Sequence, residues 1–139
     1  MRQSALFAIA VALGLAACDE TGGAIAPSLT GTEWIAETIN GKPVIEPGGV
    51  TLAFAADRVT GRSGCNRYFA SARHANGNLK IEQVGATKMA CLREGVMQQE
   101  SEFINTLQAA QAYAIHEDGR LRLTTPAGGT LVFEGPPAR

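Results

Sequence analysis

The chain has 139 residues, of which 45% are hydrophobic and 18% charged, and its formal net charge at pH 7 is −1. A chain of this length forms one domain, because domains usually contain about 100–200 residues. Its 12 basic and 13 acidic side chains include no long basic run, whereas nucleic-acid-binding proteins need clustered cations to neutralise phosphates. Binding to DNA or RNA is therefore not expected.

The first segment, residues 1–17, is predicted to be a signal peptide. Arg2 precedes a run of thirteen residues, 5–17, without a charge or a hydroxyl group. As a helix this run would span about 20 Å, less than the roughly 30 Å hydrocarbon core of a bilayer. Such a short apolar run behind a basic residue is typical of a signal peptide that is removed from the mature protein.

The signal peptide ends in Leu15-Ala16-Ala17-Cys18, which resembles the box at which bacterial lipoproteins are cleaved and acylated. The resemblance implies three acyl chains on Cys18 and stable membrane anchoring, since two membrane-binding signals already suffice. The expected location is the cell envelope, facing the periplasm. Asp19 resembles the signal that retains lipoproteins in the inner membrane of enteric bacteria. The sorting rule differs in other lineages, so anchoring in either the inner or the outer membrane is compatible with the sequence. The alternative is an ordinary cleavage site that has a cysteine next to it by chance.

Residues 18–29 are predicted to form a flexible tether, because they mix Gly, Pro, Ser and acids without periodicity. The domain is expected over residues 30–135. Its strands are predicted from short runs of apolar and β-branched residues between turn dipeptides such as Asn40-Gly41. In chain order the predicted strands are 33–40, 50–55, 58–63, 67–74, 79–84, 111–116, 121–125 and 130–134.

A single helix is predicted over residues 93–110, where the hydrophobic period changes to spacings of three and four. Glu100 and Glu102 fall on its polar side, where solubility explains them. The apolar stripe on the other side consists of Val96, Phe103, Ile104 and Leu107.

These elements predict an α+β fold with a barrel-like antiparallel sheet of about eight short strands and one helix. Turns of two to six residues are too short for parallel connections, which need a dozen or more residues. A small sheet with this many strands tends to close into a barrel, since closure removes exposed edges.

The cysteine count is odd, and Cys18 explains the odd one if it carries lipid. Cys65 and Cys91 then remain as a pair in a compartment where disulfides persist. A bridge between them would close a loop of about 26 residues and contribute on the order of 3.5 kcal/mol. The alternatives are a Cys65 nucleophile with His74 or His116 as its base, or a zinc site, but the spacings fit neither. No metal or cofactor is predicted.

Three segments share a pattern with a known family: residues 31–34 (GTEW), 61–68 (GRSGCNRY) and 87–91 (TKMAC). Their order and spacing resemble the META domain of the heat-shock protein HslJ family. The resemblance implies a small α+β domain, often anchored in the envelope and linked to stress, with no enzymatic activity. Cys65 and Cys91 fall on the paired positions of the family, so the resemblance also implies a disulfide between them.

Several other residues allow both a functional and a structural interpretation. Trp34 could mark a ligand pocket, but a core position is favoured. The run containing Gly61, Gly64 and Asn66 lacks the Lys-Ser/Thr ending of a phosphate-binding loop, so positive φ angles around a disulfide are expected instead. The arginines 58, 62, 67 and 73 lie within 16 residues and could attract an anionic surface such as lipid headgroups. A solvated strand face is the simpler explanation of these arginines.

The sequence predicts a non-catalytic envelope lipoprotein whose disulfide-linked domain interacts with another envelope component during stress. No catalytic residue is assigned, because no short stretch combines an acid, a base and a nucleophile. The alternative is a small barrel that carries an apolar ligand such as an acyl chain. An apolar cavity of at least ~300 Å³ would favour the carrier.

Overall fold

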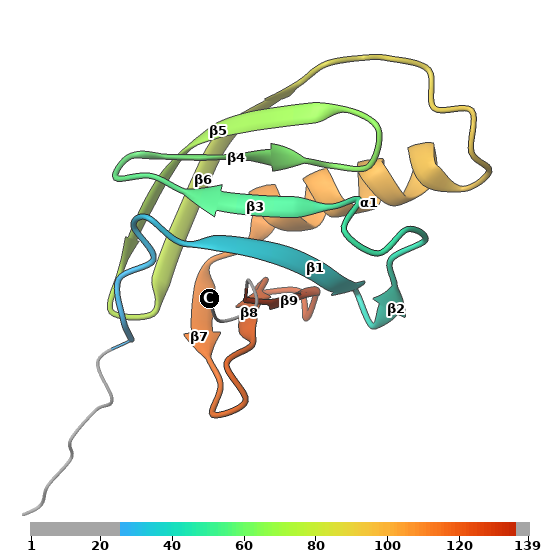
Figure 1. The fold of residues 1–139 in the computed structure, drawn as a ribbon. Coiled ribbons are helices and arrows are strands. Elements are labelled where there is room, and N and C mark those ends of the chain that lie inside the picture. The colour runs from blue at the N-terminus through green and yellow to red at the C-terminus, as the bar shows by residue number, and fades with distance from the viewer. Residues whose placement is uncertain (1–25, 136–139) are drawn as a thin grey trace, which may run out of the picture.

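The computed structural model describes residues 26–135, so the predicted signal peptide and Cys18 lie outside the described residues. This part of the chain forms nine strands and one helix (Figure 1). The helix α1 spans Val96–Ala109, and no helix in this range is long and apolar enough to cross a membrane. The strands are β1 (Glu33–Ile39), β2 (Lys42–Pro43), β3 (Thr51–Phe54), β4 (Arg58–Arg62), β5 (Arg67–Ala75), β6 (Asn78–Ala86), β7 (Ala112–Ile115), β8 (Leu121–Thr124) and β9 (Thr130–Glu134).

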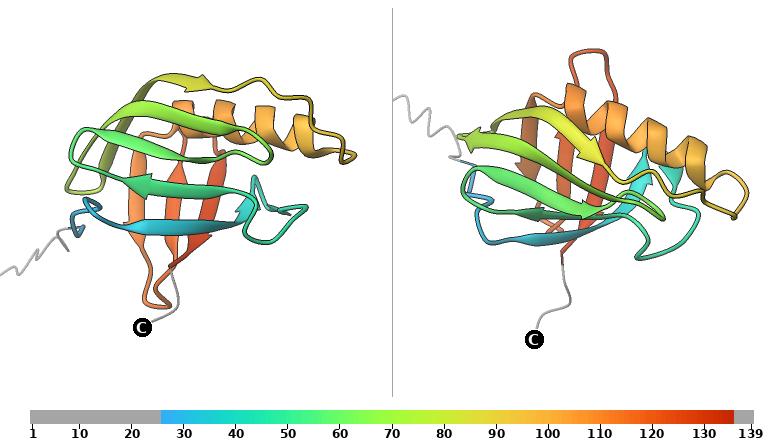
Figure 2. Two further views of the ribbon diagram at one scale, coloured as in Figure 1. Left: turned by 45° about the horizontal axis from the view of Figure 1, so that its top comes forward. Right: turned by 90° about the horizontal axis from the view of Figure 1, so that it is seen from above.

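Eight of the strands form a closed antiparallel barrel, which confirms the predicted fold class. Consecutive strands from β3 to β9 pair with one another, and β1 closes the ring by pairing with both β3 and β9. The short β2 pairs only with the end of β1. Figure 2 shows β3 to β6 on one side of the barrel and β7 to β9 on the other.

The helix covers the weakest seam of the barrel. β6 and β7 share one residue pair, between Asn78 and Ala112, and α1 packs against β6, β9 and β1. Its Phe103 and Leu107 are fully buried. The Phe103 ring meets the rings of Tyr68 and Phe133 edge-on, with centroids 5.4 and 6.4 Å apart. The predicted apolar stripe therefore completes the core.

The strands alternate between buried and exposed residues, as expected for a sheet with one face toward a core. Trp34 is 7% exposed, and its Nε1 donates to Thr32 Oγ1 at 2.7 Å, so the predicted core position is confirmed. The largest fully buried side chains are Tyr68, Phe103, Phe133, Leu29, Leu52, Leu107, Leu121, Leu123 and Leu131.

Two features of the fold were not predicted from the sequence. The first is β2, which follows a tight turn in which Asn40 and Gly41 have φ angles of 49° and 79°; its two residues are too few to produce a periodic pattern. The second is the packing of the chain just before residue 30. Leu29 is completely buried, and the Tyr113 hydroxyl donates to the Pro27 carbonyl at 3.0 Å.

Candidate functional site

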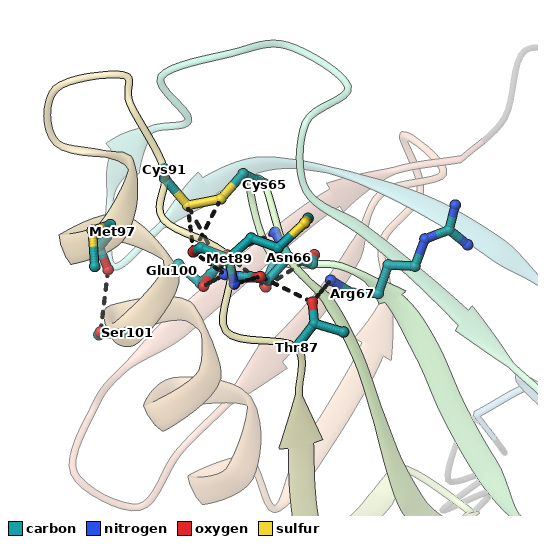
Figure 3. Close-up of a disulfide and its surroundings, with 10 residues drawn as sticks. Cys65, Asn66, Arg67, Thr87, Met89, Cys91, Met97, Glu100 and Ser101 are labelled. Atoms are coloured by element: carbon teal, nitrogen blue, oxygen red, sulfur yellow. Dashed lines mark hydrogen bonds between the residues drawn. A yellow bond between two sulfur atoms is a disulfide. The ribbon is translucent and has the colours of Figure 1, made fainter.

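The turn between β4 and β5 is bonded covalently to the long loop that precedes α1 (Figure 3). Cys65 in this turn forms a disulfide with Cys91, and their Cα atoms are 5.9 Å apart. The Asn66 carbonyl accepts from the Ser63 backbone N–H at 2.9 Å, which closes the turn, and Gly64 has a φ of 144°. The pairing implied by the family resemblance is thus present in the structure.

Glu100 extends from α1 to the same turn. Its Oε2 accepts hydrogen bonds from Ser63 Oγ at 2.9 Å and from the Asn66 backbone N–H at 3.1 Å. Its Oε1 accepts from Asn66 Nδ2 at 2.6 Å. The expectation that Glu100 merely faces solvent is therefore wrong: its carboxylate fastens the helix to the turn.

Asn66 connects this turn to the loop before the helix. Its side chain is buried, and its Oδ1 accepts from Thr87 Oγ1 at 2.9 Å and from the Met89 backbone N–H at 2.7 Å. Ser63, Asn66, Thr87 and Glu100 together are called the Asn66 network below. The network and the disulfide hold three segments together: the β4–β5 turn, residues 87–95 and the start of α1.

Tyr68 and Gly61 form a second close contact beside the turn. A Cβ atom on Gly61 would lie 2.1 Å from the Thr51 carbonyl oxygen and 2.9 Å from the Tyr68 hydroxyl. That hydroxyl donates to the Thr51 carbonyl at 2.6 Å, and burial raises the pKa of Tyr68. The expected positive φ is found at Gly64 but not at Gly61 or Asn66. Gly61 is needed for space rather than for its φ angle.

The two cysteines and the two histidines within residues 26–135 do not form a common site. The Sγ atoms of Cys65 and Cys91 and a Glu100 carboxylate oxygen lie within 4.8 Å of one another. A metal ion would need the two thiolates, and these sulfurs are bonded to each other. His74 lies near the opposite end of β5, where its Nε2 is 3.3 Å from Thr30 Oγ1. His116 follows β7. The structure brings neither histidine to Cys65.

Large apolar side chains are exposed around the start of α1. Of the five that the structure describes, four belong to this region, and we call them the helix-entry surface: Ile45, Met89, Leu92 and Met97, which are 40%, 58%, 99% and 59% exposed. The Ile45 backbone N–H donates to Gln99 Oε1 at 2.7 Å. Depressions of about 250 and 190 Å³ open on either side of Gln99. No motif in the sequence indicated this surface, because its residues come from three separate segments.

The barrel interior is occupied by side chains. Bulky residues from opposite walls, such as Leu52, Leu123 and Phe133, are at most 1% exposed. A depression of about 570 Å³ lies over β4 and β5, and one of about 330 Å³ lies beside Trp34 on β1 and β3. Both open to solvent, so neither resembles the enclosed apolar chamber of a carrier.

The family model for the META domain matches residues 27–137. A protein from Burkholderia xenovorans solved by NMR has a similar structure: it is 25% identical, the match covers 83% of this chain and 94% of that one, and the TM-score is 0.63. Another protein solved by NMR shares the fold at 23% identity, with 76% and 90% of the two chains covered and a TM-score of 0.60. No curated protein matches the sequence. Since the family model spans most of the sequence, the chain belongs to the META domain family.

Proposed function

We propose that this protein is a non-catalytic, lipid-anchored module of the cell envelope that binds another envelope protein during stress. The helix-entry surface would make the contact. The META domain supports the family part of this proposal, and Cys18 in its lipoprotein-like box supports the anchor. The disulfide fits export, because such bonds persist in the periplasm and not in the cytosol.

The observation that carries the proposal is the fixed exposure of apolar side chains at one end of the domain. Leu92 is 99% exposed although it follows Cys91, which is held by the disulfide. Protein interfaces are enriched in methionine, whose flexible side chain adapts to a partner. The disulfide holds the backbone of this loop, so association costs less backbone entropy while the methionine side chains stay free to adapt. The arrangement suits protein binding.

The non-catalytic part of the proposal rests on how the polar cluster is used. Both Glu100 oxygens and the Oδ1 of Asn66 accept hydrogen bonds from within the domain. A general base or a nucleophile has to be accessible to a substrate. These groups instead fix the loop in place, which is a structural task.

The carrier remains the alternative, and the packed interior argues against it. An acyl chain needs an enclosed apolar space of about 300 Å³ or more. In this barrel Phe103 and Phe133 meet within the space where a ligand would lie. The packed interior therefore favours protein binding over ligand transport.

Photocrosslinking in cells tests the binding surface. A photoreactive amino acid at Leu92 should give one discrete adduct with an envelope protein. The same residue at Arg122, which is exposed on β8, should give at least fivefold less. The proposal fails if neither position gives an adduct, or if the two give the same ladder.

Fractionation tests the anchor. The wild-type protein should sediment with membranes that have been washed in high salt, which screens electrostatic contacts. Cys18→Ser should be released to the soluble fraction by the same wash because it cannot be acylated. Intact mass measurement of the wild-type protein should show the added acyl chains. An unmodified amino terminus would contradict the anchor, as would equal sedimentation of both forms.

A further inference from the structure

Positive charge is concentrated on one outer face of the barrel. Residues 57–86, which include β4, β5 and β6, carry five basic and two acidic side chains, whereas the other described residues carry five basic and nine acidic ones. The basic side chains are all exposed on the outside of the sheet, and we call them the basic face: Arg58, Arg62, Arg67, Arg73 and Lys80. A mildly acidic domain thus has one cationic side.

Two arginines lie opposite each other at one end of this face. Arg62 on β4 pairs directly with Arg67 on β5. Like charges at opposed positions of neighbouring strands destabilise a sheet. Within the described residues no carboxylate forms a salt bridge with either of them, although Arg62 Nη2 donates to the Gly48 carbonyl at 2.6 Å. An anion bound between the two guanidinium groups would remove the repulsion.

The two acidic residues of this segment are already engaged elsewhere on the face. Asp57 lies 3.6 Å from Arg58, and Glu82 lies 2.8 Å from Lys80. The hydrogen bond and charge of Lys80 hold the pKa of Glu82 below its usual range. Arg73 also interacts electrostatically with Glu82. Among the described residues of this face, Arg62 and Arg67 are therefore the cations without a nearby carboxylate.

Phe69 is exposed in the middle of these cations. It follows Arg67 by two residues on the same outer side of β5, and it is 62% exposed. Its ring lies over Gly85 on β6, where a Cβ atom would come within 2.7 Å of Phe69 Cζ. The depression of about 570 Å³ is lined by Arg62, Arg67 and Phe69, among others. An aromatic ring thus lies next to the opposed arginines.

We propose that the basic face binds the headgroups of an anionic phospholipid bilayer and holds the domain side-on against it. Arginine pairs well with phosphate oxygens, and aromatic rings among basic residues favour the boundary between headgroups and acyl chains. An acidic protein or a soluble phosphate would account for the charge, whereas a bilayer would also take up the exposed Phe69 at the boundary between headgroups and acyl chains.

The path of the chain agrees with this orientation. Ala26 lies beside Gly77, in the turn that joins β5 to β6, so the chain enters the domain at the end of the basic face where Arg73 pairs with Lys80 (Figure 1). Arg67 is at the other end of β5. Residues 18–25 can span at most about 28 Å when extended. If Cys18 is acylated as expected, this short tether keeps β5 and β6 near the bilayer.

Vesicle sedimentation with the chain from residue 19 onward tests the proposal without any contribution from an anchor. This chain contains the whole closed barrel and its core. It should bind vesicles of phosphatidylglycerol and phosphatidylcholine, and it should not bind vesicles of phosphatidylcholine alone. Because a basic side chain near an anionic surface contributes about fivefold in affinity, Arg67→Glu should weaken binding at least tenfold. Arg122→Glu has the same charge change on β8 and should leave affinity within about twofold.

Two further variants distinguish a lipid bilayer from a soluble anion as the ligand of the basic face. Phe69→Ser should reduce vesicle binding at least threefold, and Leu92→Ser, on the helix-entry surface, should not change it. Circular dichroism of each variant controls for folding. Absence of binding to anionic vesicles would overturn the proposal, as would equal losses for Arg67→Glu and Arg122→Glu. Full binding by Phe69→Ser, with inorganic phosphate displacing the vesicles, would point to a soluble anion and also overturn it.

Discussion

At the scale of single residues, Asn66 and Glu100 fix the geometry of the candidate site. Each carboxylate oxygen of Glu100 accepts a hydrogen bond from Asn66, and Asn66 Oδ1 accepts from the loop at Thr87 and Met89. Hydrogen bonds to a charged group are stronger than neutral ones, and leaving a buried donor unsatisfied costs about 1–3 kcal/mol. Neither residue can be replaced by an isostere without losing a bond.

Glu100→Gln is expected to destabilise the domain by about 1–3 kcal/mol, because the new amide group would face a donor of Asn66 or Ser63. Urea denaturation measures this change. Glu102→Gln is the matched control on the same helix. Glu102 Oε2 is 3.6 Å from the exposed Lys42, and such pairs contribute little; its Oε1 accepts from Asn40 Nδ2 at 3.1 Å, a bond that the glutamine oxygen can keep. Equal effects of the two substitutions would contradict the role of the network.

The disulfide could be predicted from the sequence, because both cysteines fall on positions of the family pattern. The Asn66 network could not be predicted. Glu100 was expected on the polar side of α1, although it follows Val96 by four residues and precedes Phe103 by three, which puts it in line with the apolar stripe. Periodicity could not show that a turn 34 residues earlier packs against this position. The structural role of Gly61 was also difficult to predict from the sequence. Gly61 in isolation suggests an unusual φ, while its real constraint is the Tyr68 hydroxyl bound to Thr51 on a neighbouring strand.

At the scale of elements, the long loop before α1 is the segment that depends most on its attachments. Residues 87–95 form neither strand nor helix, and the disulfide and the Asn66 network tie them to the β4–β5 turn. Loop closure by a bond across 26 residues stabilises a folded domain by roughly 3.5 kcal/mol in the loop-entropy model. The exposed Met89 and Leu92 owe their fixed positions to these attachments.

Replacement of both cysteines, Cys65→Ser/Cys91→Ser, should lower the free energy of unfolding by about 2–4 kcal/mol. It should also increase amide hydrogen exchange in residues 87–95 more than in β5, which is held by its strand partners. Titration of the unreduced wild-type domain from residue 19 onward should find no free thiol. Two reactive thiols, or unchanged exchange in the loop, would refute this account of the loop.

The strands were predictable where a turn dipeptide separates two apolar runs, as at Asn76-Gly77 and Asp118-Gly119. Local pattern accounts for these elements because hairpin pairing is local. It failed for β2, whose two residues have no period, and it could not show that β6 and β7 barely pair. The helix packs where β6 and β7 separate, and such packing between distant elements cannot be deduced from a local pattern.

At the scale of the whole molecule, closure and charge distribution decide which surfaces are available. Ile35 on β1 pairs with Glu134 on β9, although more than 90 residues separate them in the sequence. This pairing could be inferred only from the tendency of small sheets to close and from the family resemblance. Because the barrel is closed and its interior is filled with side chains, partners can bind only to its outer surface. On the part of the chain that the structure describes, solubility alone does not explain the basic face or the helix-entry surface.

The helix-entry surface at the start of α1 is proposed to bind an envelope protein in the conformation that the disulfide maintains. Crosslinking from Leu92 should therefore be compared between the wild type and Cys65→Ser/Cys91→Ser at equal protein levels. We expect one discrete adduct in the wild type and at least fivefold less without the disulfide. A wild-type chain that gives no adduct, or an adduct formed equally well without the disulfide, would contradict the claim.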